Sequence, residues 1–115
     1  MSWSSDTIHW VAGIIEGEGS FGLKNRARAH PSIKVAMTDE DIIRRLHTET
    51  GIGRVNGPYL DGGRSKPIWH WTVTTKRDTA RLMLAAYPVL GTRRQGKVRE
   101  IVAAVHWPMY ERDPR

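Results

Sequence analysis

Two glutamates separated by a glycine stand where an apolar segment ends, in the stretch Glu16-Gly17-Glu18-Gly19. The preceding positions 10–15 are uncharged, so a helix over them must be buried on more than one side. Glu18 is then placed at the end of that helix, where the dipole is negative and a carboxylate is disfavoured by about 0.3–1 kcal/mol unless a cation is near. The stretch predicts a functional site at Glu18, and the alternative is a solvated turn after a core helix.

The same predicted helix carries Gly13 and Gly17, which lie four residues apart and therefore share one face. Each glycine costs about 1 kcal/mol relative to alanine in a helix interior. Close approach by another backbone is a physical reason for such residues to be present. The two glycines therefore predict a face on which this helix packs closely.

Basic side chains are in excess, with 18 Lys and Arg against 12 Asp and Glu and a net charge of +6. That balance favours a polyanionic partner. Many of the cations fall on strand positions opposite the apolar ones, or in the loop beside them. Such strands fit the DNA major groove, where Arg and Lys reach guanine and Asn reaches adenine, and the alternative is a solvated sheet face. The polar residues on this face or in the loop beside it are Lys24, Arg26, Arg28, Lys34, Arg54, Asn56, Arg64, Lys66, His70 and Thr72.

Hydrophobic periodicity and capping residues predict an α+β domain that repeats a helix–hairpin unit and adds helices at its end. Trp69 and Trp71 are in phase with Val73, which predicts core positions rather than base-stacking surfaces. The first predicted helix is capped by Ser5 or Asp6 and ends at Glu18, and strands over 20–28 and 32–37 follow on either side of a turn at His30-Pro31. The second predicted helix is capped by Thr38 and ends at Gly51. A strand from Arg54 that breaks at Gly57-Pro58, a strand from Pro67 to Thr75, and helices from Asp78 to Tyr87 and from Arg93 to Trp107 complete the chain.

Length and composition exclude several classes of protein. A chain of 115 residues is one domain, expected over residues 1–108, with a charged tail over 109–115 that we expect to fray. The absence of cysteine excludes disulfides and thiolate zinc sites. No apolar stretch approaches the roughly 20 residues of a membrane span, and the first residues lack a signal peptide. We therefore expect a soluble, intracellular protein with no targeting signal, membrane partner or small-molecule substrate.

Residues Val11 to Gly19, flanked by Trp10 and Ser20-Phe21, resemble the LAGLIDADG motif of homing endonucleases at almost every position. The resemblance continues beyond the motif and covers about residues 8–105. The further matching segments are Thr38-Asp39, Gly51-Ile52-Gly53 and the stretch from Pro88 to Arg94.

This resemblance implies the αββαββα fold, in which helices cover one face of a four-stranded antiparallel sheet and the other face forms a saddle for DNA. The polar residues named above for that face and its loop, from Lys24 to Thr72, are then the implied DNA contacts. It implies metal binding by Glu18 with the backbone carbonyl of Gly17, and an electrostatic catalytic role for Arg93 near the scissile phosphate. The implied cofactor is Mg²⁺, for which Mn²⁺ can substitute. Glu16 lies about 200° from Glu18 around the helix, which predicts a supporting or capping role rather than a metal ligand.

A single motif in a short chain implies two chains per active unit. The implied interface is the first helix of each chain, through Trp10, Gly13, Ile14 and Gly17. The implied function is a homodimeric, divalent-metal-dependent endonuclease that hydrolyses phosphodiesters at a long pseudo-palindromic site in double-stranded DNA.

One residue departs from the family pattern. Some members have a glutamine at the end of the second strand that orients water, and Met37 stands at the nearest position here. A thioether is a poor hydrogen-bond partner for water. The alternative function is therefore a non-cleaving DNA-binding regulator or an RNA maturase on the same fold.

Overall fold

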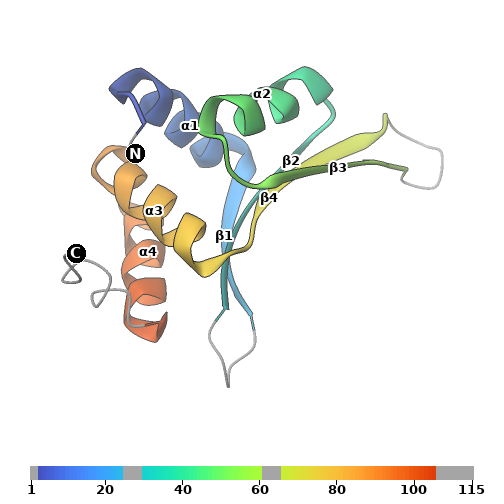
Figure 1. Ribbon diagram of the computed structural model, residues 1–115. Helices are drawn as coiled ribbons and strands as arrows, with labels where there is room; N and C mark the ends of the chain where they lie inside the picture. The colour runs from blue at the N-terminus through green and yellow to red at the C-terminus, as the bar shows by residue number, and fades with distance from the viewer. Residues whose placement is uncertain (1–2, 25–29, 61–65, 106–115) are drawn as a thin grey trace.

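The computed structural model describes residues 3–24, 30–60 and 66–105. The predicted α+β element order is confirmed, and the helices gather on one side of a single sheet (Figure 1). The elements are α1 (Ser5–Glu18), β1 (Gly19–Lys24), β2 (His30–Met37), α2 (Glu40–Thr50), β3 (Arg54–Tyr59), β4 (Ile68–Val73), α3 (Lys76–Ala86), the 3₁₀ turn η1 (Tyr87–Val89) and α4 (Thr92–Val105).

The four strands are antiparallel in the order β1-β2-β4-β3. Alternate residues along them face the helices and form the core, as the alternation of apolar positions predicted. Trp71 is fully buried, as predicted, and its indole N–H donates to the Ile52 carbonyl at 3.1 Å. Trp69 is half-buried, and the Arg44 guanidinium lies 5.1 Å from its ring centroid. Within the described residues, no helix is long and apolar enough to cross a membrane.

Two predicted helix caps were displaced. Ser4, rather than Ser5 or Asp6, caps α1, and its hydroxyl accepts from the Thr7 N–H at 3.1 Å. Asp39, rather than Thr38, precedes α2 and makes no side-chain capping bond. In both cases the cap is the last residue with extended backbone dihedrals, and several neighbouring residues have capping side chains. Composition alone therefore leaves the cap ambiguous.

Two predicted breaks in the strands were wrong. His30 and Pro31 belong to β2 and pair with Lys24 and Leu23 of β1, because proline is tolerated near the start of a strand. Similarly, β3 continues through Gly57-Pro58 to Tyr59, with an irregular register between Asn56 and Tyr59. β3 is an edge strand, where a proline does not need to interrupt pairing with a second neighbour.

The sheet face opposite the helices is polar, and its residues form rows across the strands. One row runs through Ser20, Lys34, Thr72 and Arg54, which are paired in that order from β1 to β3. The neighbouring row contains Ala36, His70 and Asn56. Beyond the helices the two hairpins diverge, so that this open face lies between them (Figure 1).

On this face, the surroundings of His70 clearly shift its pKa. Its ring lies 4.6 Å from that of Tyr59. Burial lowers the pKa of His70 below its usual 6.5, and the positive charge of Lys34 lowers it further. The unfolded chain therefore protonates His70 at a higher pH than the folded chain does. As the pH falls through 6.5 toward the folded-state pKa, this difference lowers the free energy of unfolding.

We predict that Lys34→Met raises the pKa of His70 without restoring it fully, because burial remains. NMR titration of the imidazole would measure this directly. The same variant should lose less stability than wild type on acidification from neutral pH into the range below 6.5. A wild-type pKa at or above 6.5 would contradict the assignment.

Candidate functional site

The carboxyl end of α1 carries Glu18 as an exposed side chain, directly before β1 begins at Gly19. The last turn of α1 contains no basic residue, and no ion pair joins Glu18 to another described residue. Two negative features therefore coincide, the carboxylate and the last-turn carbonyls of the helix. This is the electrostatic setting that the sequence predicted, and it favours a cation.

Glu16, two residues earlier, is bound to α4. One of its carboxylate oxygens accepts from the Gly91 N–H at 2.6 Å, and the other lies 3.5 Å from Nε of Arg94. Arg94 also donates to the Glu16 backbone carbonyl at 3.5 Å. The end of α1 is thus joined to the first turn of α4, where Arg93 is located.

Arg93 is exposed and lines a hollow of about 470 Å³ between α4 and the start of β1. Three cations line this hollow, and a single carboxylate lies among them: Glu100, 3.8 Å from the Lys97 ammonium. The hollow therefore has an excess of positive charge, suited to an anion such as phosphate. Its lining residues are Ser20, Phe21, Arg93, Arg94, Gly96, Lys97 and Glu100.

Sequence reasoning identified Arg93 but did not identify Arg94 or Lys97. A signal for Lys97 was available, because Arg93 and Lys97 are four residues apart and so share a helix face. No sequence signal indicated Arg94, since its partner Glu16 is 78 residues away.

The predicted DNA contacts that fall within the described residues share the polar face of the sheet or its border. Lys34, Arg54, Asn56 and Lys66 are exposed, and Thr72 and His70 are half-buried. Lys24 pairs with His30 and so extends the same register toward the hairpin end. Arg26, Arg28 and Arg64 lie outside the described residues.

The face of α1 that carries Gly13 and Gly17 is exposed, and a Cβ atom added at either glycine would meet no atom within 4 Å. The close approach that these glycines predicted is therefore not made within the described part of this chain. Ile14 is half-buried. Trp10 is half-buried too, with the Arg45 guanidinium of α2 at 4.1 Å from its ring centroid.

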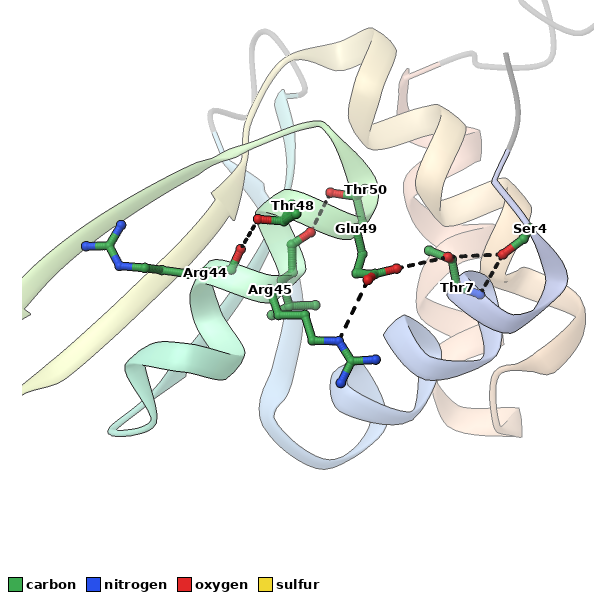
Figure 2. A network of polar contacts seen from close by, with 8 residues as sticks. Ser4, Thr7, Arg44, Arg45, Thr48, Glu49 and Thr50 are labelled. Atoms are coloured by element: carbon green, nitrogen blue, oxygen red, sulfur yellow. Dashed lines mark hydrogen bonds and ion pairs between the residues drawn. The ribbon is translucent and has the colours of Figure 1, made fainter.

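A separate polar contact joins α1 to α2 (Figure 2). The Glu49 carboxylate accepts from the Thr7 hydroxyl at 3.3 Å and lies 3.9 Å from Nε of Arg45. α1 is thus joined to two other helices, to α2 through Glu49 and to α4 through Glu16.

The donor atoms near Glu18 form only part of a metal site. No group of three or more His, Asp or Glu side chains in residues 3–24, 30–60 and 66–105 is arranged to hold a metal ion. Glu18 and the last-turn carbonyls, including that of Gly17, nevertheless supply hard oxygen donors. Such a partial set suits Mg²⁺, which commonly keeps several waters and binds through one or two carboxylates together with substrate phosphates.

Three solved structures with a similar fold are homing endonucleases or meganucleases. The archaeal intron-encoded homing endonuclease I-Vdi141I, complexed with DNA, has a TM-score of 0.67 and 14% identity, over 91% of this chain and 70% of that one. I-CvuI, with its target and calcium, has a TM-score of 0.62 and 16% identity, over 82% of this chain and 64% of that one. The LAGLIDADG meganuclease I-AabMI, bound to uncleaved DNA, has a TM-score of 0.70 and 13% identity, over 91% of this chain but only 38% of that one.

Neither models of protein families nor curated protein sequences give a match to this sequence. The structural similarity extends over most of the chain, and it agrees with the motif at Val11 to Gly19 and with the element order. The chain therefore has the LAGLIDADG homing endonuclease fold.

Proposed function

We propose that this chain is one subunit of a homodimeric DNA endonuclease that hydrolyses phosphodiesters with the help of a divalent metal. The observation that carries the proposal is the pair of unmatched charges at the joined ends of α1 and α4. Glu16 and Arg94 are 3.5 Å apart, whereas Glu18 and Arg93 are exposed and make no ion pair with another described residue. A cation at Glu18 and a phosphate at Arg93 would match both charges.

The residues have separate roles in this proposal. Glu18 and the Gly17 carbonyl would hold Mg²⁺, with Mn²⁺ as a substitute. When bound, the metal would supply Lewis-acid activation of water and stabilisation of charge on the phosphodiester. The Arg93 guanidinium would stabilise the negative charge that develops on the phosphate, and arginine is not suited to act as a base.

Double-stranded DNA is the substrate that the open sheet face favours. Lys34 and Arg54 lie in one row across the strands, and Asn56 lies in the next. Phosphate contacts by such cations would give affinity and register, and contacts with base edges would give specificity. The solved complexes of I-Vdi141I and I-CvuI with DNA support this assignment.

A second copy of the chain is proposed to cover the Gly13–Gly17 face of α1. Two chains related by a two-fold axis would bring both Glu18 carboxylates to one centre, where bound cations would relieve their repulsion. The corresponding DNA site would be pseudo-palindromic, because the symmetry of the protein is mirrored in its target.

One observation favours a non-cleaving, nucleic-acid-binding function as the second candidate. Met37, at the end of β2, is half-buried and packs against the core. Its side chain cannot orient water as a glutamine would. The presence of Glu18 and Arg93 favours the nuclease. Cleavage assays distinguish the nuclease from the binding function.

We predict that duplex DNA binding by wild type weakens log-linearly with salt. Lys34→Ala and Arg54→Ala should each reduce the magnitude of the salt slope by about 1 if the residue contacts a phosphate. Arg77→Ala, an exposed cation on α3, is the matched control. Fluorescence anisotropy over a salt series measures the slopes, and equal slopes in all four proteins would exclude the sheet face as the binding surface.

We predict that Glu18→Gln binds target DNA with near wild-type affinity but no longer cuts it in Mg²⁺ or Mn²⁺. Glu16→Gln should retain measurable cleavage, because Glu16 contacts α4. Wild type in Ca²⁺ should bind without cutting. Incubation with a saturating target library, read by sequencing, measures cleavage. Efficient cutting by Glu18→Gln would refute the site, and tight binding with no cutting by wild type would establish the binding function instead.

We predict that wild type has the mass of two chains by light scattering at micromolar concentration. Gly13→Leu and Gly17→Leu should yield monomers that keep the fold and lose tight DNA binding, because the added side chains hold the two helices apart. Ala104→Leu, an exposed substitution on α4, is the control. A monomeric wild type with an intact fold would contradict the two-fold model.

A further inference from the structure

The two helix ends at the candidate site each carry charges of the unfavourable sign. The last turn of α1 contains Glu16 and Glu18 and no basic residue. The first turn of α4 contains Arg93 and Arg94 and no acidic residue. A helix dipole favours the opposite arrangement at both ends.

Glu16 and Arg94 each bind the end of the other's helix, so that each helix end gains a charge of the favourable sign. The Glu16 carboxylate accepts from the Gly91 N–H at 2.6 Å, and the Gly91 carbonyl accepts the first helical bond of α4 from Gln95 at 2.9 Å. Glu16 thus caps the positive end of α4. In return, the Arg94 guanidinium lies at the negative end of α1 and donates to the Glu16 carbonyl at 3.5 Å.

Arg94 depends on this partner for its charge balance. Its side chain is only 12% exposed, whereas that of Glu16 is 36% exposed. Its Nε atom is buried without a hydrogen bond, so the carboxylate at 3.5 Å supplies electrostatic compensation only. The guanidinium also lies 6.0 Å from the Phe21 ring of β1. Arg94 is therefore held between α1, β1 and α4, and its neighbour Arg93 is left exposed at the hollow.

We propose that Glu16 is a positioning residue for the phosphate-binding turn of α4, an inference that rests on the nuclease function proposed above. By holding Gly91 and Arg94, Glu16 fixes the place of Arg93 relative to the end of α1. It also balances the charge of Arg94, and Lys97 lies 3.8 Å from the Glu100 carboxylate. Arg93 is therefore the cation in the hollow that remains available to a phosphate.

The test compares Glu16→Ala and Glu16→Gln with wild type by single-turnover cleavage in Mg²⁺ and by target affinity in Ca²⁺. We expect Glu16→Ala to cut about 10- to 100-fold more slowly, since misplacement of a catalytic group by about 1 Å has effects of this size. Its affinity for DNA should be equal to that of wild type or tighter, because a negative charge is lost and Arg94 is released. Glu16→Gln keeps an oxygen acceptor for the Gly91 N–H, and its cleavage rate should fall between those of wild type and Glu16→Ala.

Glu49→Ala is the matched control, because Glu49 also joins two helices through its carboxylate but lies on the α2 side of α1 (Figure 2). It should cut at the wild-type rate. Thermal unfolding of every variant confirms that the fold is retained at the assay temperature.

The outcomes separate this inference from the function on which it rests. If wild type cuts and Glu18→Gln does not, but Glu16→Ala cuts at the wild-type rate, the positioning role is wrong and the nuclease stands. If Glu16→Ala loses affinity as much as cleavage, its role is only structural and the inference is again wrong. If wild type itself cuts no target, the proposed nuclease fails, and the positioning role fails with it.

Discussion

The direct passage from α1 into β1 is the constraint on which the rest of the site depends. No linker separates the two elements, since α1 ends at Glu18 and β1 begins at Gly19. At position 19 a Cβ atom would lie 2.9 Å from the Ile15 Cα atom, so the chain can leave the helix this tightly only with glycine. Because Ile15 is fully buried, the helix end, and with it Glu18, is fixed relative to the sheet that is proposed to hold the DNA.

Electrostatics at this junction divides four charged side chains into two groups. Glu16 and Arg94 form an ion pair and each contacts the end of the other's helix, at distances of 3.5 Å or less. Glu18 and Arg93, on the same two helices, are exposed. Glu16 is two residues from Glu18 on α1, and Arg94 is next to Arg93 on α4. The contacts of the first pair therefore fix the backbone that carries the proposed reactive pair.

Much of the fold could be predicted from local patterns. The periodicity of apolar residues gave the element order, and the alternation in β2 and β4 placed Val35 and Trp71 in the core. Local patterns failed where several neighbouring residues had the same capping chemistry, as at Ser4 and Asp39. They also failed where proline remained within a strand, as at Pro31 and Pro58. The contact between Glu16 and Gly91 joins residues 75 positions apart, and no periodicity within one element could indicate it.

The irregular pairing in β3 has a consequence for which surfaces of this protein a second sheet could join. An edge strand with evenly spaced donors and acceptors invites another sheet to extend it. Pro58 supplies no N–H, and Gly57, with a φ of 136°, interrupts the spacing of the backbone groups around it. The opposite edge strand, β1, is contacted by α4. The edge of β3 is therefore irregular around Gly57 and Pro58, and strand addition there would be less favourable than the helix-to-helix contact proposed for α1.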